Sequence, residues 1–283
     1  MKRIYVSLFC LAVSVVAFSQ SATPTNKIKL VNGQKIVVES TTDVTASLTM
    51  GMELTSTSTS VNALEVKNSN PGEYIISNTL TKLKMNTNMM GQANNYDSES
   101  KTGNNEDMAK VFDDKLNKPV DITIDNTTGS AIVEKKKKGQ ADVDETNATA
   151  DIMKIFSDNT SDDAIVAGAF EIIPQGKSVG QSWADTANSK EIKTISTYTL
   201  KSISGNEAVI QSNIVATAVN KLNFQEMEFE IKSETKTNGE IITDISTGLV
   251  KKRTTIADIT GSIQMMGQDM PISAKATSTI IYK

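Results

Sequence analysis

Residues 44–54 read VTASLTMGMEL, and apolar and polar side chains alternate along them. Every even position from Val44 to Leu54 is apolar, and the positions between them hold Thr, Ser, Gly or Glu. A period of two is typical of a β-strand with one buried and one solvated face. We therefore predict a long antiparallel strand here, with Met50-Gly51-Met52 at its tip.

The Met-Gly tip recurs in two other Ser/Thr-rich stretches, at Met89-Met90-Gly91 and at Met265-Met266-Gly267. Aromatic residues make up 5% of the chain and there are five prolines, while Thr, Ser, Val and Ile recur throughout, which favours strands joined by short turns. Long strands twist and curl their sheet. We predict a mainly β fold of long antiparallel strands in curved sheets, as a sandwich or a partial barrel, with a short helical insert between two β halves.

The chain divides into four parts by composition. Lys2-Arg3, an apolar run and small residues after it predict an export signal over residues 1–19. An N-terminal β half follows over 20–133, a charged linker with short helices over 134–178, and a C-terminal β half over 179–283. After the signal we expect no transmembrane segment, and a periplasmic or extracellular location, in contact with the envelope.

Apolar residues at helical spacing predict three short helices. One includes Met108 and Phe112, a second spans 148–156, and a third spans 165–173 and ends before Pro174. The second and third lie between the two β halves, whose inner sheet faces are the large apolar surface available to them. We expect Phe156, Phe170 and Ile173 to pack against the apolar side of the strands.

Two smaller patterns concern the strands themselves. The apolar parity switches near Leu80, which predicts a β-bulge. The five residues from Asp125 to Gly129 and those from Asp244 to Gly248 share an Asp-x-Ser/Thr-Thr-Gly pattern, which predicts the same turn in each half.

The chain resembles an uncharacterised family of exported bacterial proteins known only as a domain of unknown function. The resemblance rests on the order of several motifs: Lys29-Leu30 to Gly33-Gln34, the Met-Gly-Gln tips, Tyr96-Asp97-Ser98, Ala169-Phe170 to Pro174, Val179-Gly180-Gln181-Ser182-Trp183, and the Asp244 to Gly248 turn. It implies an all-β body and an envelope or secreted location, and it supplies no activity and no catalytic residue.

Several kinds of chemistry are excluded or disfavoured by composition. The chain has no histidine, and its one cysteine, Cys10, lies within the predicted signal, so disulfides, Cys/His zinc sites and histidine-based catalytic triads are excluded. A net charge of −4 disfavours nucleic acid as a partner. We expect no cofactor, no metal site and no catalytic residue.

The methionines are the most suggestive feature. Thioethers bind Cu(I), but no histidine or mature cysteine completes such a site, so packing in a core or pocket is favoured over copper. Gathered at one mouth of a curved sheet, the tips would instead make an adaptable apolar surface. The candidate ligand-binding residues are Met50, Met52, Met89, Met90, Met265, Met266, Trp183 and Phe170.

These observations favour a non-catalytic binding or scaffold protein that holds an apolar small molecule, lipid or peptide on a concave sheet. One alternative is an enzyme that acts on glycans through paired carboxylates, with Trp183, the single tryptophan, as a stacking platform. We expect no Asp or Glu in surroundings apolar enough to raise its pKa, which disfavours that alternative. A purely structural envelope protein is the other, and the sequence leaves the oligomeric state open.

Overall fold

The computed structural model describes residues 24–132 except 48–50, 71, 90 and 101, and residues 161–283 except 190–191, 225–226 and 266–267. The predicted signal and the predicted helix over 148–156, with Phe156, lie outside the described residues. The two described helices are α1 (Glu106–Phe112) and α3 (Asp162–Ala167). The first six strands are β1 (Lys35–Ser47), β2 (Glu53–Asn70), β3 (Glu73–Met89), β4 (Gln92–Asp97), β5 (Pro119–Asp125) and β6 (Ala131–Ile132). The other six are β7 (Ser182–Asn188), β8 (Ile192–Ser204), β9 (Glu207–Phe224), β10 (Met227–Asp244), β11 (Val250–Met265) and β12 (Gln268–Tyr282).

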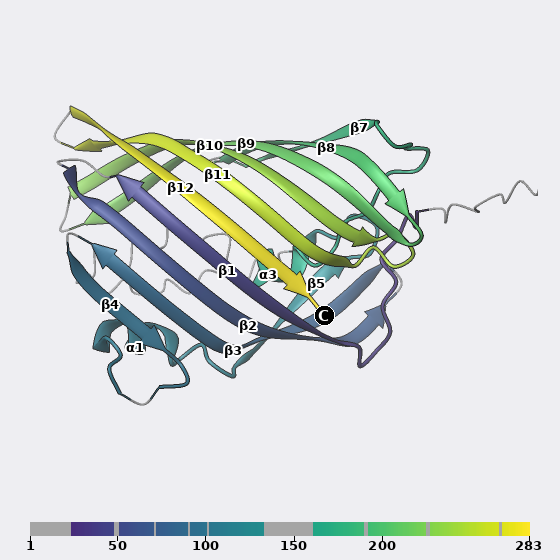
Figure 1. The fold of residues 1–283 in the computed structure, drawn as a ribbon, viewed down its shortest axis with the longest axis horizontal. Helices are drawn as coiled ribbons and strands as arrows, with labels where there is room; N and C mark the ends of the chain where they lie inside the picture. The colour runs from purple at the N-terminus through teal and green to yellow at the C-terminus, as the bar shows by residue number, and fades with distance from the viewer. Residues whose placement is uncertain are drawn as a thin grey trace, which may run out of the picture.

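All twelve described strands belong to one antiparallel, curved sheet (Figure 1). Its order is β6-β5-β3-β2-β1-β12-β11-β10-β9-β8-β7, and β4 pairs with β3 outside this path. The mainly β fold of long antiparallel strands is therefore confirmed, with one open sheet in place of a sandwich. The two β halves are parts of the same sheet, because β1 pairs with β12 from Val38↔Tyr282 to Ser47↔Ser273.

The long strand predicted over residues 44–54 is two strands. The alternation is correct, since Val44, Ala46 and Leu54 are buried, while Thr45 and Glu53 are exposed. However, β1 ends at Ser47 and β2 begins at Glu53, and Ser47 pairs with Glu53. Gly51, with φ +74, lies in the connection, where a positive φ favours glycine. β1 and β2 therefore form a hairpin, with Gly51 in its connection, that keeps the same face buried on both strands.

The two ends of the sheet differ. The connections β1–β2, β3–β4, β9–β10 and β11–β12 share one end, at the left of Figure 1, which we call the methionine end. The opposite end, which we call the helical end, holds the β2–β3, β8–β9 and β10–β11 turns and α3. The main hydrophobic core lies there, where Val166 of α3, Phe170 and Ile173 pack against buried strand residues such as Ile36 and Ile241. We call the side of the sheet that faces this core the inner face.

Register shifts account for part of the curvature. The predicted bulge near Leu80 is confirmed, because Val61 pairs with Lys82 and Asn62 with Leu80, which leaves Thr81 as the extra residue. Further shifts in the described pairings leave Lys67, Lys201 and Lys251 as extra residues. Bulges bend a strand and increase its twist, so these three help to curl the sheet at the helical end.

α3 is held on the inner face by a chain of polar side chains. The Asn62 Nδ2 donates to the Asn78 Oδ1 at 3.1 Å, and the Asn78 Nδ2 donates to the Asp162 Oδ1 at 2.7 Å. Both asparagines are buried. Ser161 stands at the N-cap position, although its side chain makes no capping hydrogen bond. Asp162 and Asp163 in the first turn interact favourably with the helix dipole.

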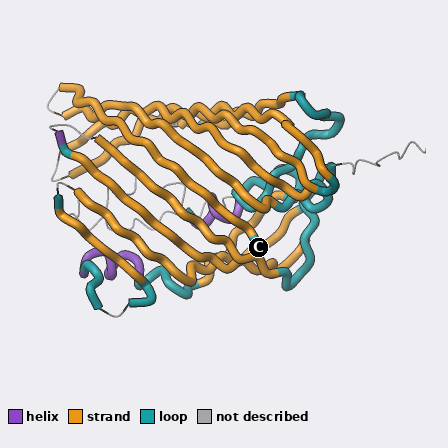
Figure 2. The backbone as a smooth tube through the Cα atoms, in the orientation of Figure 1, coloured by secondary structure: helices purple, strands orange, loops and turns teal. Residues whose placement is uncertain are grey.

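The predicted helix over 165–173 is wrong beyond Ala167. α3 ends there, and Phe170 forms an isolated antiparallel bridge with Leu249. The Glu171 N–H donates to the Gly248 carbonyl, and the Val250 N–H donates to the Ala169 carbonyl. We call residues 168–175, drawn as loop after α3 in Figure 2, the strap, because these backbone hydrogen bonds tie the segment to the β10–β11 turn. Phe170 and Ile173 nevertheless pack on the inner face as expected.

The two Asp-x-Ser/Thr-Thr-Gly turns use the same hydrogen bonds. The Asp125 Oδ1 accepts from the Thr127 N–H, the Thr127 hydroxyl and the Thr128 N–H. The Asp244 Oδ1 accepts from the Ser246 N–H, the Ser246 hydroxyl and the Thr247 N–H. Residues 25–29 pass between these turns, since Ile28 donates to the Asn126 carbonyl and Lys29 to the Thr247 carbonyl. The predicted turn device is thus confirmed, and the segment before β1 ties its two copies together.

These turns make a testable source of acid sensitivity. Hydrogen bonds from Thr127, and then from Thr128, lower the pKa of Asp125. At Asp244 burial raises the pKa, but the hydrogen bonds from Ser246 and Thr247 outweigh it, so the pKa of Asp244 is also lowered. A lowered folded-state pKa gives stability that is present above the unfolded value of 3.8 and is lost as pH falls through the folded value. We expect the Asp125→Asn/Asp244→Asn variant to melt below the wild type at pH 7, with a gap that narrows toward pH 2. Melting curves by circular dichroism test this, and a gap independent of pH would contradict it.

Candidate ligand-binding cleft

The candidate site is a cleft of about 660 Å³ at the helical end. One wall comes from the β5–β6 turn, including Gly129, and another from β7 and β8; the strap lies between them. Because β6 and β7 are the two edges of the sheet, the cleft lies where the edges of the curved sheet approach each other. Gly129 has φ +72, and a Cβ there would lie 3.1 Å from the Phe170 Cβ, so this turn packs directly on the strap.

Trp183 and Tyr198 form an aromatic wall of the cleft. They are register partners on β7 and β8, and their rings stack with centroids 5.6 Å apart and planes at 19°. β7 is an edge strand of the sheet, so no described strand lies beyond Trp183. Burial, followed by the charge of Glu171, raises the pKa of Tyr198, so its hydroxyl stays protonated at neutral pH. The pair offers a rigid aromatic surface with one polar hydroxyl.

A buried ion pair lies behind this wall. The Arg253 Nη2 is 3.2 Å from the Glu171 Oε2, and the two side chains are only 17% and 11% exposed. The same nitrogen donates to the Gly168 carbonyl at 3.4 Å, while the Arg253 Nε is buried without a partner among the described residues. Burial raises the pKa of Glu171, and the adjacent Arg253 offsets part of this rise. The ion pair therefore carries a desolvation cost at the floor of the cleft.

Glu171 corrects a sequence-based expectation. No acidic residue was expected in apolar surroundings, yet the structure buries Glu171 and raises its pKa. The signal was present in the sequence, because Glu171 stands between Phe170 and Ile172 in the run AFEIIP. Asp185, two residues after Trp183 on β7, also lines the cleft, so two carboxylates share it.

The structure divides the predicted site residues between the two ends of the sheet. Phe170 and Trp183 line the cleft at the helical end. Met52 follows the β1–β2 turn and is half-buried, and Met89 packs against the small cluster of Ala46, Leu54 and Ala274 at the methionine end. Met50, Met90 and Met266 and the side chain of Met265 lie outside the described residues. Ligand binding by any of these residues stays a prediction.

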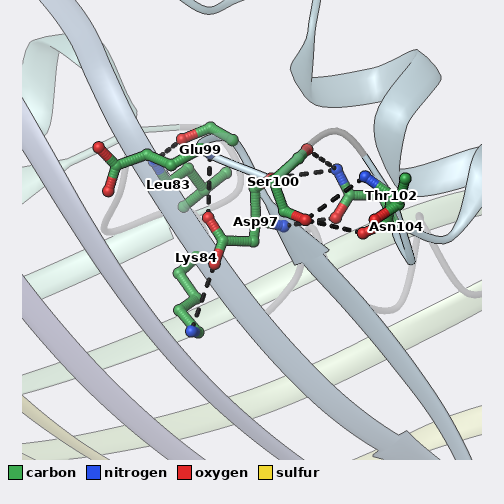
Figure 3. A network of polar contacts seen from close by, with 8 residues as sticks. Leu83, Lys84, Asp97, Glu99, Ser100, Thr102 and Asn104 are labelled. Carbon is green, nitrogen blue, oxygen red and sulfur yellow. Dashed lines mark hydrogen bonds and ion pairs between the residues drawn. The ribbon is translucent and has the colours of Figure 1, made fainter.

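The polar network after β4 is structural in character (Figure 3). Asp97 accepts from the Glu99 N–H and pairs with Lys84 at 3.3 Å, which together lower its pKa, and Asn104 closes the loop on the Asp97 backbone. The neighbouring Tyr96 is buried, contacts the Phe112 ring and donates to Asp113. The hydrogen bonds of the Tyr96-Asp97-Ser98 motif thus fix a loop against α1.

Between residues 24 and 132 and between 161 and 283, the described residues contain no cluster of Asp and Glu suited to a metal ion. Neither described helix is long and apolar enough to cross a membrane. Fold and cleft together define a class: a single-sheet, open, curved β protein with a mixed aromatic and charged cleft between its sheet edges.

The chain belongs to a family of unknown function, DUF6263, whose model matches residues 71–250. The resemblance to a domain of unknown function is confirmed on this point. No curated protein matches the chain.

Among solved structures, lipovitellin, described for its lipid–protein interactions, matches 90% of this chain with a TM-score of 0.50 and 11% sequence identity. The chain spans only 25% of lipovitellin, and this likeness concerns the fold alone. The match to an outer membrane channel of Pseudomonas putida F1 covers 93% of this chain and 100% of the channel. The match to OccK5 of Pseudomonas aeruginosa covers 89% of this chain and 98% of OccK5. Their TM-scores of 0.22 and 0.24, at 9% and 6% identity, carry no argument about the fold.

Proposed function

We propose that this protein is a non-catalytic binding module that holds the acyl chain of a lipid or a similar apolar molecule on the inner face of its sheet. One observation carries the proposal. Between the helical core and the methionine end, the inner positions of β1, β2, β10, β11 and β12 carry no charged side chain, whereas the outer positions of the same strands carry many. A neutral concave face beside a charged convex one favours an apolar occupant.

The composition of this inner surface supports an adaptable ligand. Ser58 of β2 lies opposite Thr42 of β1 and Met85 of β3, and all three are half-buried. The residues in register with Thr42 on β12 and β11 are Ser278 and Thr255, and the next inner positions toward the methionine end are Ala276, Ala257, Ala274 and Ile259. Small side chains project little above the sheet, and the two described helices pack mainly elsewhere, α1 on β4 and α3 on β3, β5 and β6. The fold shared with lipovitellin adds support, since lipovitellin is described for lipid–protein interactions.

The proposed location is outside the cytoplasm, and the proposed partners are apolar molecules found there. An export signal over residues 1–19 would deliver the protein to the periplasm or the exterior, in contact with the envelope. There an apolar peptide is the competing occupant of the inner face, and a purely structural role is the competing function.

A matched pair of substitutions tests the proposal. Ser58→Glu places a charge on the inner face, while Thr59→Glu places it on the exposed outer face of the same strand. We expect the wild type and Thr59→Glu to bind the neutral apolar dye Nile red with equal affinity. A buried unpaired charge costs several kcal/mol, so Ser58→Glu should weaken binding by at least about tenfold. Equal loss in both variants, or no binding by the wild type, would contradict the proposal.

A second candidate function, hydrolysis of a glycan by two carboxylates, is favoured by the cleft. Glu171 and Asp185 both line it, and the raised pKa of Glu171 is what a general acid requires. Turnover of a panel of fluorogenic glycosides tests this candidate. Turnover that is abolished in both Glu171→Gln and Asp185→Asn would support it, and absence of turnover across the panel would count against it.

A further inference from the structure

The charges of the cleft do not balance. Its charged lining residues are Glu171, Asp185 and Arg253, two carboxylates against one guanidinium. Arg253 is engaged, because its Nη2 contacts the Glu171 carboxylate at 3.2 Å and the Gly168 carbonyl at 3.4 Å. Asp185 is exposed and has no hydrogen-bond or ion-pair partner within the described ranges. The surplus negative charge therefore belongs to Asp185 at the mouth of the cleft.

An aromatic surface lies beside that charge. Asp185 follows Trp183 by two residues on β7, so both side chains stand on the same face of the strand. Their register partners, Ser196 and Tyr198, lie opposite them on β8 and line the same cleft. Because Trp183 is in the edge strand, no neighbouring strand from the described ranges covers the face of its indole that points away from Tyr198. An aromatic face next to an unpaired carboxylate is the combination that binds organic cations.

We propose that this cleft binds an ammonium group, with Trp183 as the cation–π surface and Asp185 as the counter-charge. The ammonium can belong to a small soluble molecule or to the headgroup of a lipid. The strap explains why the site is preformed, since Phe170 and Ile173 anchor it in the core and Gly129 packs on it from the other edge of the sheet. The ammonium site does not depend on an acyl chain at the inner face, so either proposal can fail alone.

Trp183 makes the test direct, because it is the only tryptophan of the chain and its fluorescence reports on this cleft. The probes are choline and 3,3-dimethylbutanol, a neutral molecule of the same shape. We expect choline to change the fluorescence of the wild type saturably and dimethylbutanol to leave it unchanged. An equal response to both would overturn the proposal in favour of plain apolar contact, and no response to choline at millimolar concentrations would overturn it outright.

Two variants identify the counter-charge. An exposed ion pair contributes up to about 1 kcal/mol, so Asp185→Asn should weaken choline binding by about fivefold and remove its dependence on salt. Asp258→Asn, which removes one carboxylate from an exposed position of β11, should bind choline like the wild type. Equal affinity of Asp185→Asn and the wild type would exclude Asp185 and overturn the proposed site. A fluorescence response to glucose that exceeds the response to choline would also overturn it, in favour of glycan binding.

The source of the ammonium is decided by comparing choline with a short-chain phosphatidylcholine below its micellar concentration. Tighter binding of the phosphatidylcholine, weakened by Asp185→Asn, supports a lipid headgroup. Equal binding supports a free small molecule. Nile red binding by the Ser58→Glu and Thr59→Glu variants tests the inner face independently of choline. Failure of the ammonium site is therefore distinguished from failure of the apolar site on the inner face.

Discussion

Replacing Phe170 by alanine should lower the free energy of unfolding by about 3 to 5 kcal/mol, the usual cost of removing a buried phenylalanine side chain. Phe170 is 4% exposed, bridges Leu249 in the β10–β11 region and packs in the main core with Val166 of α3. It also contacts the turn at Gly129 on the other sheet edge. Loss of its ring would therefore open a cavity at the point where strap, helix and both edges meet. Urea denaturation measured by circular dichroism gives the value directly.

The control is Ile256→Ala on the outer face of β11, where the side chain is 43% exposed. It should change the free energy of unfolding by less than about 0.5 kcal/mol. If the strap were a mobile lid, Phe170→Ala would leave the unfolding midpoint unchanged and would instead increase the binding of a hydrophobic dye. That outcome would contradict the structural role assigned to the strap here.

The second large effect concerns the buried ion pair. Arg253→Met leaves Glu171 in a buried position without its partner, and breaking a buried pair in this way costs about 3 to 5 kcal/mol. Burial then raises the pKa of Glu171 further. A raised folded-state pKa means that the folded protein binds the proton more tightly than the unfolded chain. The stability that Arg253→Met loses relative to the wild type should therefore be largest at neutral pH and should shrink as pH falls through the pKa of Glu171.

The double variant Arg253→Met/Glu171→Leu supplies the matched control. It removes both charges, so most of the lost stability should return, and its remaining deficit should not depend on the protonation of Glu171. Denaturation curves of the wild type, both single variants and the double variant form a complete cycle. A double variant as unstable as Arg253→Met would contradict the account, because it would assign the loss to packing instead of to the unpaired charge.

The alternation of apolar and polar residues was sufficient to predict the strands, but it did not predict which strands pair with each other. The alternation over residues 44–54 and the parity switch near Leu80 correctly gave the buried face and the bulge at Thr81. The pairing of β1 with β12 joins residues more than 200 positions apart, and no local period encodes it. The bulges at Lys67, Lys201 and Lys251 were not recognised, because a lysine in the bulged position resembles an ordinary outward residue.

The candidate site was predicted in part, with Trp183 and Phe170 named but grouped with the methionine tips. The antiparallel strands place Met52 and Met89, the tip residues whose side chains the structure describes, at the opposite end of the sheet from Trp183 and Phe170. Helical spacing through Ile173 suggested a helix where the structure has the strap, because the backbone of the strap pairs with the β10–β11 turn and this tertiary contact overrides the local pattern. Glu171 was missed although it stands in the apolar run AFEIIP, and Arg253 was missed because its sequence neighbours Lys252 and Thr254 are polar and only the fold brings it to Glu171.

The central claim, an apolar molecule held on the inner face of the sheet, is tested most directly by native mass spectrometry of the protein purified from its own host without detergent. We predict a mass above that of the polypeptide, released at high collision energy as a molecule with an acyl chain, and absent from Ser58→Glu but present in Thr59→Glu. A spectrum of the bare polypeptide, together with no uptake of added fatty acid by the wild type, would contradict the claim.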